Sequence, residues 1–168
     1  MGKVYIKAIA AEIEQPNLSD LIRQFIYNQE HPDDISSASI SHLPIICSKI
    51  TIYSSAVVTY RARAGDMRRE RIHAVKSWRN GPGRYDTIWV NTGSFADGIR
   101  GFDPARVQLF FSYSHFGDKY PCALVRWFSR VGDSPDEHTG KWVYQQDDDE
   151  RPPSIIHLDS IVRPARLV

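Results

Sequence analysis

The sequence predicts one α+β domain that is mainly β: a curved antiparallel sheet or small β-barrel with an N-terminal helix packed on it. Only one segment, near the N-terminus, has the apolar spacing of a helix. Beyond residue 45, short runs of β-branched and aromatic residues alternate with Gly, Pro and Asp, which are typical of turns. The 168 residues correspond to about one domain. We expect residues 1–44 to form a helical segment packed on a β-barrel-like part, residues 45–168.

The predicted helix spans residues 17–30. Its apolar residues recur at helical spacing: Leu18, Leu21, Ile22, Phe25 and Ile26. The helix ends at His31-Pro32, because a residue before proline avoids helical angles. Residues 3–13 alternate weakly and leave both strand and helix open.

The predicted strands are residues 46–60, 86–90, 106–113, 120–128, 142–145 and 155–162. The first contains Ser54-Ser55, where we expect a bend or bulge. Residues 106–113 and 120–128 form an antiparallel hairpin. Alternation places Val107, Leu109, Phe111 and Tyr113 on one face, and we expect Leu109, Phe111, Leu124 and Trp127 to be buried.

The charge is segregated although the net charge is only +1. Residues 61–79 contain seven Lys/Arg and two acidic residues, whereas residues 133–150 contain seven acidic residues and one Lys. Such asymmetry is more informative than the total. The two segments are either solvated loops that partly neutralise each other, or separate faces for a polyanion and for a basic partner.

The basic segment 61–84 is a candidate for sequence-independent binding of DNA or RNA. Arginine neutralises phosphates and aromatic rings stack on bases, and this segment interleaves both. Solvated loops and targeting signals have similar compositions. The candidate nucleic-acid-binding residues are Arg61, Arg63, Arg68, Arg69, Arg71, Lys76, Arg79 and Arg84.

The tryptophans Trp78, Trp89, Trp127 and Trp142 lie in or beside predicted strands. Packing in the core is the ordinary role of such residues. Exposed aromatics at the rim of a barrel could instead enclose a methylated lysine by cation–π attraction. The candidate partner-binding residues are Trp78, Tyr85, Trp89 and Trp142.

One pattern points to enzyme chemistry. His157-Leu158-Asp159 matches part of a non-haem iron facial triad, and either His115 or His138 would have to complete it by folding. A hydrogen-bonded histidine in a terminal strand is the simpler interpretation. Zinc spacings, nucleophile elbows and phosphate-binding loops are absent from the sequence. We therefore predict no catalytic residue, metal or cofactor.

The sequence also predicts an intracellular location. The N-terminus has no apolar segment typical of a signal peptide, and no apolar run is long enough to span a bilayer. The two cysteines, Cys47 and Cys122, follow no disulfide framework, so we expect buried thiols in a reducing compartment.

Several segments in a fixed order resemble a known family: residues 67–72 with 77–79, 107–112, 120–125 with Trp127-Phe128, 132–137 with 139–142, and 156–163. In this order they are similar to the C-terminal domain of large proteins encoded by transposable elements of mushroom-forming fungi, of the Kyakuja–Dileera–Zisupton type or travelling with it. The resemblance covers residues 17–168 and is most specific over residues 120–142. It implies no catalytic residues.

The block 120–142 also resembles, more faintly, a bromo-adjacent homology (BAH) domain, in which an acidic turn follows a strand that ends in an aromatic pair. That family implies a β-barrel-like chromatin module that binds proteins. We therefore expect a non-enzymatic interaction module in the nucleus, associated with a fungal transposable element, that binds a chromatin protein or basic peptide. The alternatives are sequence-independent nucleic-acid binding through residues 61–84 and a metal-dependent enzyme using His157 and Asp159.

Overall fold

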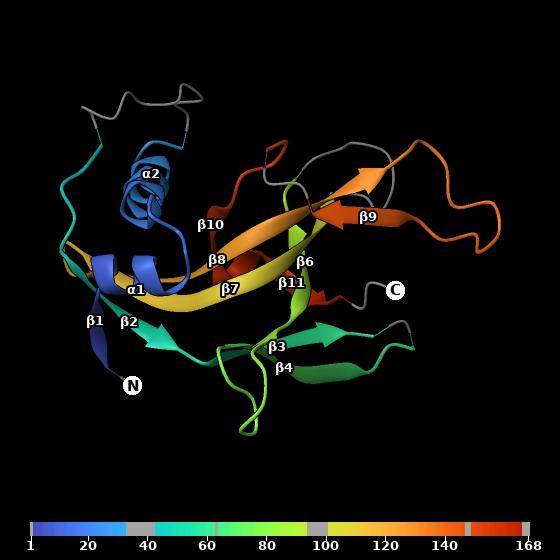
Figure 1. Ribbon diagram of the computed structural model, residues 1–168, viewed down its shortest axis with the longest axis horizontal. Coiled ribbons are helices and arrows are strands. Elements are labelled where there is room, and N and C mark those ends of the chain that lie inside the picture. Colours follow the sequence, from blue (N-terminus) through green and yellow to red (C-terminus); the bar gives the residue numbers. More distant parts are fainter. Residues whose placement is uncertain (1, 33–42, 63, 94–100, 147–148, 166–168) are drawn as a thin grey trace.

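The computed structural model describes residues 2–32, 43–62, 64–93, 101–146 and 149–165. This part of the chain forms a mainly-β α+β fold, as the sequence predicts (Figure 1). Its elements are β1 (Lys3–Tyr5), α1 (Ile6–Glu12), α2 (Leu18–Glu30), β2 (Lys49–Tyr53), β3 (Ser55–Arg61), β4 (Met67–Val75), β5 (Arg84–Tyr85), β6 (Thr87–Asn91), β7 (Phe102–His115), β8 (Asp118–Val131), β9 (Val143–Gln146), β10 (Ser154–His157), the 3₁₀ helix η2 (Leu158–Ser160) and β11 (Ile161–Pro164).

Within the described residues the strands form one eight-stranded and one three-stranded antiparallel sheet. The long strands β7 and β8 pair with each other, β7 also pairs with β2 and β6, and β8 also pairs with β9 and β10. The predicted barrel is wrong. Closure requires every strand to have two neighbours, but β1 pairs only with β2 and β11 only with β6 in the described part.

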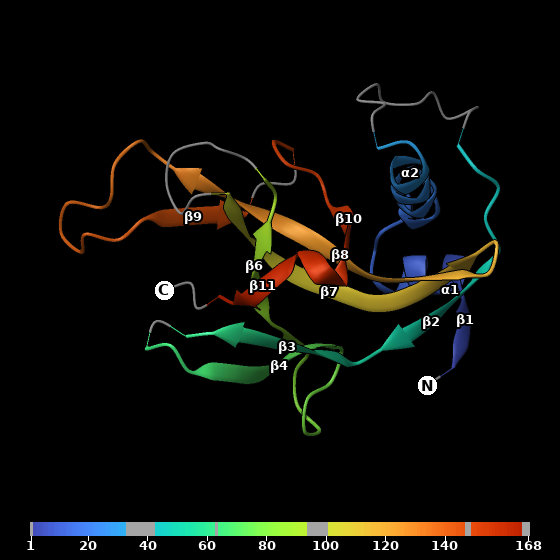
Figure 2. The same ribbon diagram turned by 180° about the vertical axis from the view of Figure 1, so that it is seen from behind.

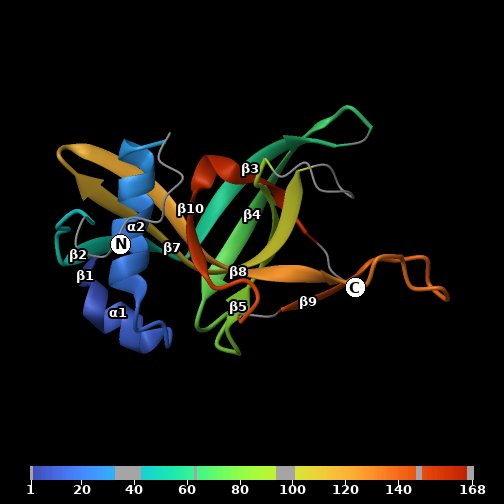
Figure 3. The same cartoon turned by 90° about the horizontal axis from the view of Figure 1, so that it is seen from above.

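The two helices cover one face of the β7–β8 hairpin, and the predicted helix is confirmed as α2 (Figure 3). The apolar stripe of α2 faces the sheet, with Leu18 and Ile26 fully buried. Residues 3–13, which left strand and helix open, form β1 followed by α1. The first core therefore lies between these helices and Leu109, Phe111, Tyr113, Cys122 and Leu124 of the hairpin.

A second core lies on the opposite face of the same hairpin, where the three-stranded sheet packs (Figure 2). The predicted common face of Val107, Leu109, Phe111 and Tyr113 is wrong for Val107, which lies in this second core. The register shifts between Val107 and Leu109, so the extra residue Gln108 reverses the alternation. The four residues predicted to be buried are buried, although Trp127 belongs to the second core.

The predicted bend at Ser54-Ser55 separates two strands of different sheets. β2 pairs with β1 and β7, whereas β3 pairs with β4 in the three-stranded sheet. β4, which contains three of the eight candidate basic residues, was not among the predicted strands. The predicted strand 155–162 is divided by η2 into β10 and β11.

No helix among the described residues is long and apolar enough to cross a membrane. Both thiols are unpaired, but only one is buried. Burial raises the pKa of the Cys122 thiol to about 12. The prediction is wrong for Cys47, which is exposed because it precedes β2 rather than lying within a strand.

Candidate nucleic-acid interface

The antiparallel pairing of β3 with β4 determines from which face of the hairpin each basic residue projects. Arg61 lies opposite Met67, Thr59 opposite Arg69, and Val57 opposite Arg71. Directly paired residues of an antiparallel ladder project from the same face. Arg61, Arg69 and Arg71 therefore share one face, and all three are exposed.

The next strand extends this face. Arg84 of β5 lies opposite Val75 of β4. Alternate residues of a strand project from the same face, so Val75, and with it Arg84, lies on the face of Arg69 and Arg71. Arg71 Nη1 donates a hydrogen bond to Ser55 Oγ at 3.2 Å, which holds its guanidinium over the sheet. We call this outer surface of β3, β4 and β5 the basic face.

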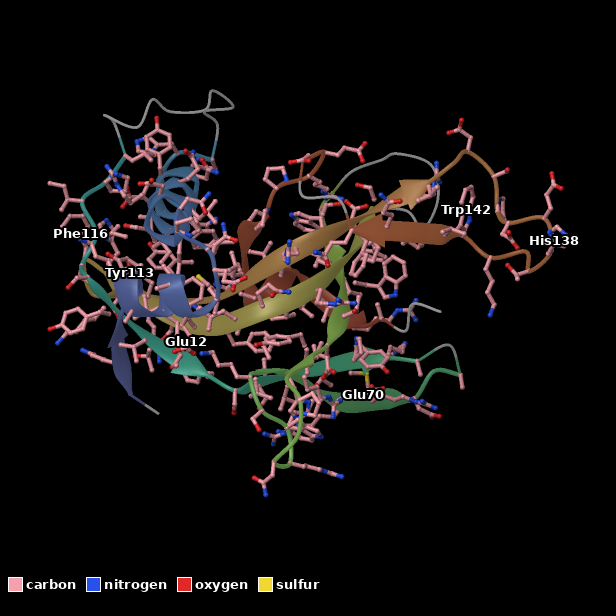
Figure 4. The ribbon with its side chains drawn as sticks, in the orientation of Figure 1. Glu12, Glu70, Tyr113, Phe116, His138 and Trp142 are labelled. Atoms are coloured by element: carbon pink, nitrogen blue, oxygen red, sulfur yellow. The ribbon has the colours of Figure 1, made fainter. Side chains whose placement is uncertain are left out.

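At the base of the hairpin the opposite face points into the protein, whereas Arg68 near the tip is exposed. Ile72 is buried in the second core, and Tyr60 donates a hydrogen bond to the Glu70 carboxylate (Figure 4). This bond raises the pKa of the Tyr60 hydroxyl. The Glu70 carboxylate is thus turned away from the basic face, and so is Arg68, which lies opposite Tyr60.

The segment between β4 and β5 adds one more arginine. Gly81 N–H donates to the Trp78 carbonyl at 2.9 Å, and Arg79 and Asn80 between them have positive φ values of 52° and 64°. Positive φ at both central residues is the geometry of a type I′ turn. The turn places the Arg79 guanidinium 5.4 Å from the centre of the Trp78 ring.

Trp78 is surrounded by groups of the chain itself. Its ring centre is 4.3 Å from that of His73 and 4.8 Å from the Arg84 guanidinium carbon. The same indole is therefore in contact with Arg79, Arg84 and His73. Trp78 supports the two arginines by cation–π attraction, instead of offering an empty ring for stacking.

Asp86 connects this cluster to the sheet, although sequence reasoning did not single it out. Its carboxylate accepts hydrogen bonds from the His73 backbone N–H at 2.8 Å and from Arg84 Nε at 2.8 Å. Burial raises the pKa of the Asp86 carboxyl, but these bonds outweigh burial and hold the pKa below its ordinary value. The spacing Arg84-x-Asp86, two residues apart on an extended segment, is the signal that could have revealed the pair.

Five of the eight candidate basic residues therefore belong to the basic face: Arg61, Arg69, Arg71, Arg79 and Arg84. Arg68 lies on the opposite face, Lys76 Nζ forms an ion pair with Glu12 Oε1 of α1 at 2.7 Å, and Arg63 lies outside the described residues. Within the described ranges, no carboxylate forms an ion pair with Arg61, Arg69, Arg71 or Arg79.

The four candidate partner-binding aromatics do not gather at one site. Trp78 belongs to the basic face, whereas Tyr85 lies opposite Ala74 and packs against the second core. Trp89 contacts Tyr144 of β9 edge to face, with 6.0 Å between ring centres. Trp142 lies beneath the Arg130 guanidinium at 4.2 Å, on the β8–β9 hairpin (Figure 4). This arrangement gives no enclosure for a methylated lysine.

The acidic residues of 133–137 lie on a separate hairpin. Asp133, Asp136 and Glu137 are exposed in the connection between β8 and β9. Asp136 Oδ1 accepts hydrogen bonds from the Thr139 hydroxyl and backbone N–H, both at 2.8 Å, and these lower its pKa. In the part of the chain that the structure describes, no ion pair joins this connection to the basic face, which favours two separate faces.

His157 and Asp159 form a local cap. β10 ends at His157, and Asp159 lies in η2 instead of on the predicted strand. His157 Nδ1 accepts a hydrogen bond from the Asp159 backbone N–H at 3.3 Å. Among the described residues, no third His, Cys, Asp or Glu joins them, and His115 instead lies 3.2 Å from Glu30.

The chain matches no family model, and neither a curated protein nor a solved structure is significantly similar to it. The resemblances to transposon-encoded and BAH domains therefore stay predictions.

Proposed function

We propose that this protein is a non-enzymatic interaction module whose basic face binds the phosphate backbone of a nucleic acid. One observation carries the proposal: Arg61, Arg69, Arg71, Arg79 and Arg84 come from three strands and a turn onto one outer surface. The Glu70 carboxylate lies on the other face of the hairpin, where it is bonded to Tyr60. The Asp86 carboxylate is bonded to Arg84. Asp66, in the turn of the hairpin, is the acidic residue nearest to Arg61 in sequence.

The chemistry of these side chains favours phosphate. Guanidinium groups are always charged and present several donors in a planar fork that fits phosphate oxygens. Contacts to the backbone position a protein on nucleic acid without reading the sequence. Among its described residues, the face has no aromatic ring that is free to stack on a base, and no projecting helix. We therefore infer binding with little sequence preference.

The resemblance to domains of transposable-element proteins is consistent with this function, because nucleic acid is an expected partner in that setting. A location in the nucleus and contact with chromatin follow from the same proposal. The enzyme alternative receives no support from a constellation of side chains in the described residues, so we do not carry it further.

The test is the salt dependence of binding to a 20-base-pair duplex DNA of arbitrary sequence. Each phosphate contact contributes about −0.9 to the slope of log K against log salt, so the four arginines without an ion pair predict a slope of about −3.6. Affinity should then fall about 150-fold between 50 and 200 mM salt by the same rule. Replacing Arg69 and Arg71 with Ala should bring the slope to about −1.8.

The register supplies a matched control. Replacing Arg68 and Lys141 with Ala removes the same charge, but from the face of β4 opposite the basic face and from the β8–β9 connection. This variant should keep a slope near that of the unchanged protein. Equal slopes for the two variants, or an affinity that does not change with salt, would contradict the proposal.

A further inference from the structure

Residues of α2, β6 and β10 line a cleft of about 400 Å³. The elements α2 and β10 lie side by side (Figure 3). The described lining of the cleft contains no Asp, Glu, Lys or Arg, in a chain of which 24% is charged. The polar part of the lining includes Gln24, Asn28, Asn91, Ser154 and His157. An uncharged ligand that forms hydrogen bonds fits such a surface.

The cleft follows an edge of the sheet, because β10 pairs with β8 on one side and with no strand on the other in the described residues. The direction of its backbone groups follows from the β7–β8 hairpin. The two-residue turn Phe116-Gly117 joins His115 to Asp118, so His115 and Asp118 form a hydrogen-bonded pair. Pairs then alternate along the ladder.

This alternation places Ser112 and Pro121 in a non-hydrogen-bonded pair, as required because proline has no N–H. Continuing along β8, Cys122 and Leu124 bond to β7, whereas Ala123 and Val125 direct their backbone groups toward β10.

On β10, Ile156 and Ser154 lie opposite Ala123 and Val125 and bond to them. The backbone N–H and C=O groups of Ile155 and His157 therefore point away from β8, along the unpaired edge.

We propose that this cleft binds an extended, uncharged peptide segment of a partner protein, which adds as a strand to the outer edge of β10. Unpaired strand edges bind extended chains through main-chain hydrogen bonds. Leu21 of α2 and Ile155 of β10, which are both partly exposed, provide apolar surface for the side chains of the peptide. Gln24 Nε2 donates a hydrogen bond to Asn28 Oδ1 at 2.9 Å, and the Gln24 carbonyl and the Asn28 amide nitrogen can pair with the peptide backbone. β10 has four residues, so the core of the bound segment is about four residues long.

This site is separate from the basic face. None of the described residues that line the cleft belongs to β3, β4 or β5. Figure 1 shows α2 above the β7–β8 hairpin and β3 and β4 below it. The variant with Ala at positions 69 and 71 should therefore bind the peptide with unchanged affinity.

The experiment selects ligands for the full chain from a phage-displayed library of random eight-residue peptides. We expect enriched peptides with at least four consecutive uncharged residues. A synthetic copy should slow amide hydrogen exchange at Ile155 and His157 at least tenfold. Methylating the alternate peptide nitrogens that face β10 should weaken binding about tenfold, which corresponds to the loss of one or two hydrogen bonds.

A pair of variants separates the cleft from the rest of the surface. Replacing Gln24 and Asn28 with Ala should weaken peptide binding about fivefold to tenfold, whereas replacing the exposed Gln145 of β9 with Ala should not. The absence of enriched peptides would overturn the proposal. So would enriched peptides that leave the exchange of Ile155 and His157 unchanged or that tolerate N-methylation.

Discussion

Replacing Asp86 with Ala should destabilise the protein, because this carboxylate holds β4, β5 and the turn that carries Arg79 together. It accepts bonds from the His73 backbone N–H and from Arg84 Nε, both at 2.8 Å, and it lies 3.2 Å from His73 Nδ1. His73 is buried, so its N–H would lose its partner without gaining water. Leaving such a donor unsatisfied costs about 1–3 kcal/mol, and a bond to a charged group contributes about 1.5–3 kcal/mol.

The expected loss for Asp86→Ala is about 2–4 kcal/mol and not the full sum, because Arg84 is 40% exposed and can return to water. Asp86→Asn keeps an acceptor for the His73 N–H and loses the charge, so its loss should be about half as large. Urea unfolding monitored by tryptophan fluorescence measures the loss of stability in both variants. We expect a lower midpoint and an unchanged slope of the free energy of unfolding against urea concentration.

The pH dependence gives an independent check. The pKa of Asp86 is held below its ordinary value of 3.8 in the folded chain. A group with a lowered folded pKa contributes stability above its unfolded pKa, and this contribution is lost as the pH falls through the folded value. The difference between the unchanged protein and Asp86→Ala should therefore shrink as the pH falls below about 3.8. A loss under about 0.5 kcal/mol at pH 7, the range of ordinary surface changes, would refute this role.

Two further predictions concern the first core. Phe111→Ala should lower the free energy of unfolding by about 3–5 kcal/mol in urea, because the ring is 1% exposed between the sheet and the helices; a loss under about 1 kcal/mol would contradict this. Burial raises the pKa of Tyr113 from 10.0 to about 12 and that of Cys122 from 9.0 to about 12. A group whose pKa is raised by folding contributes stability that is complete below its ordinary pKa and is lost as the pH rises toward the folded value. The free energy of unfolding should therefore fall between pH 9 and pH 12, and it should fall by a smaller amount in Cys122→Ala.

The helix and the central hairpin could be predicted because their burial is regular. Leu18, Ile22 and Ile26 of α2 repeat at the helical period, since one stripe of the helix faces the core. In β7 and β8 the apolar runs are long because both faces are buried. The bulge at Gln108 could not be predicted, because an inserted residue changes the face of its neighbours without changing the composition.

β4 was not predicted because its burial is irregular along the strand. On the face opposite the basic face, the positions near the tip of the hairpin are occupied by the exposed Arg68 and the half-buried Glu70, so apolar alternation begins only at Ile72. A strand with one face in solvent and a polar inner end has no clear period-two pattern. The open edges of the sheet were also beyond prediction, because closure into a barrel depends on which strands pair, and β10 and β11 have one neighbour each in the described part.

The candidate interface shows what local composition can and cannot establish. The sequence contains eight basic residues in one segment, but their grouping depends on three nonlocal facts. The register of β3 against β4 separates Arg68 from Arg69, the packing of α1 brings Glu12 to Lys76, and Asp86 holds Arg84 beneath Trp78. A net charge of +1 is therefore compatible with a surface for polyanions. Phosphate is attracted by the local electrostatic potential of one face of the protein and not by its net charge. Here the fold turns the Glu70 carboxylate away from the basic face and places Asp133, Asp136 and Glu137 on another hairpin.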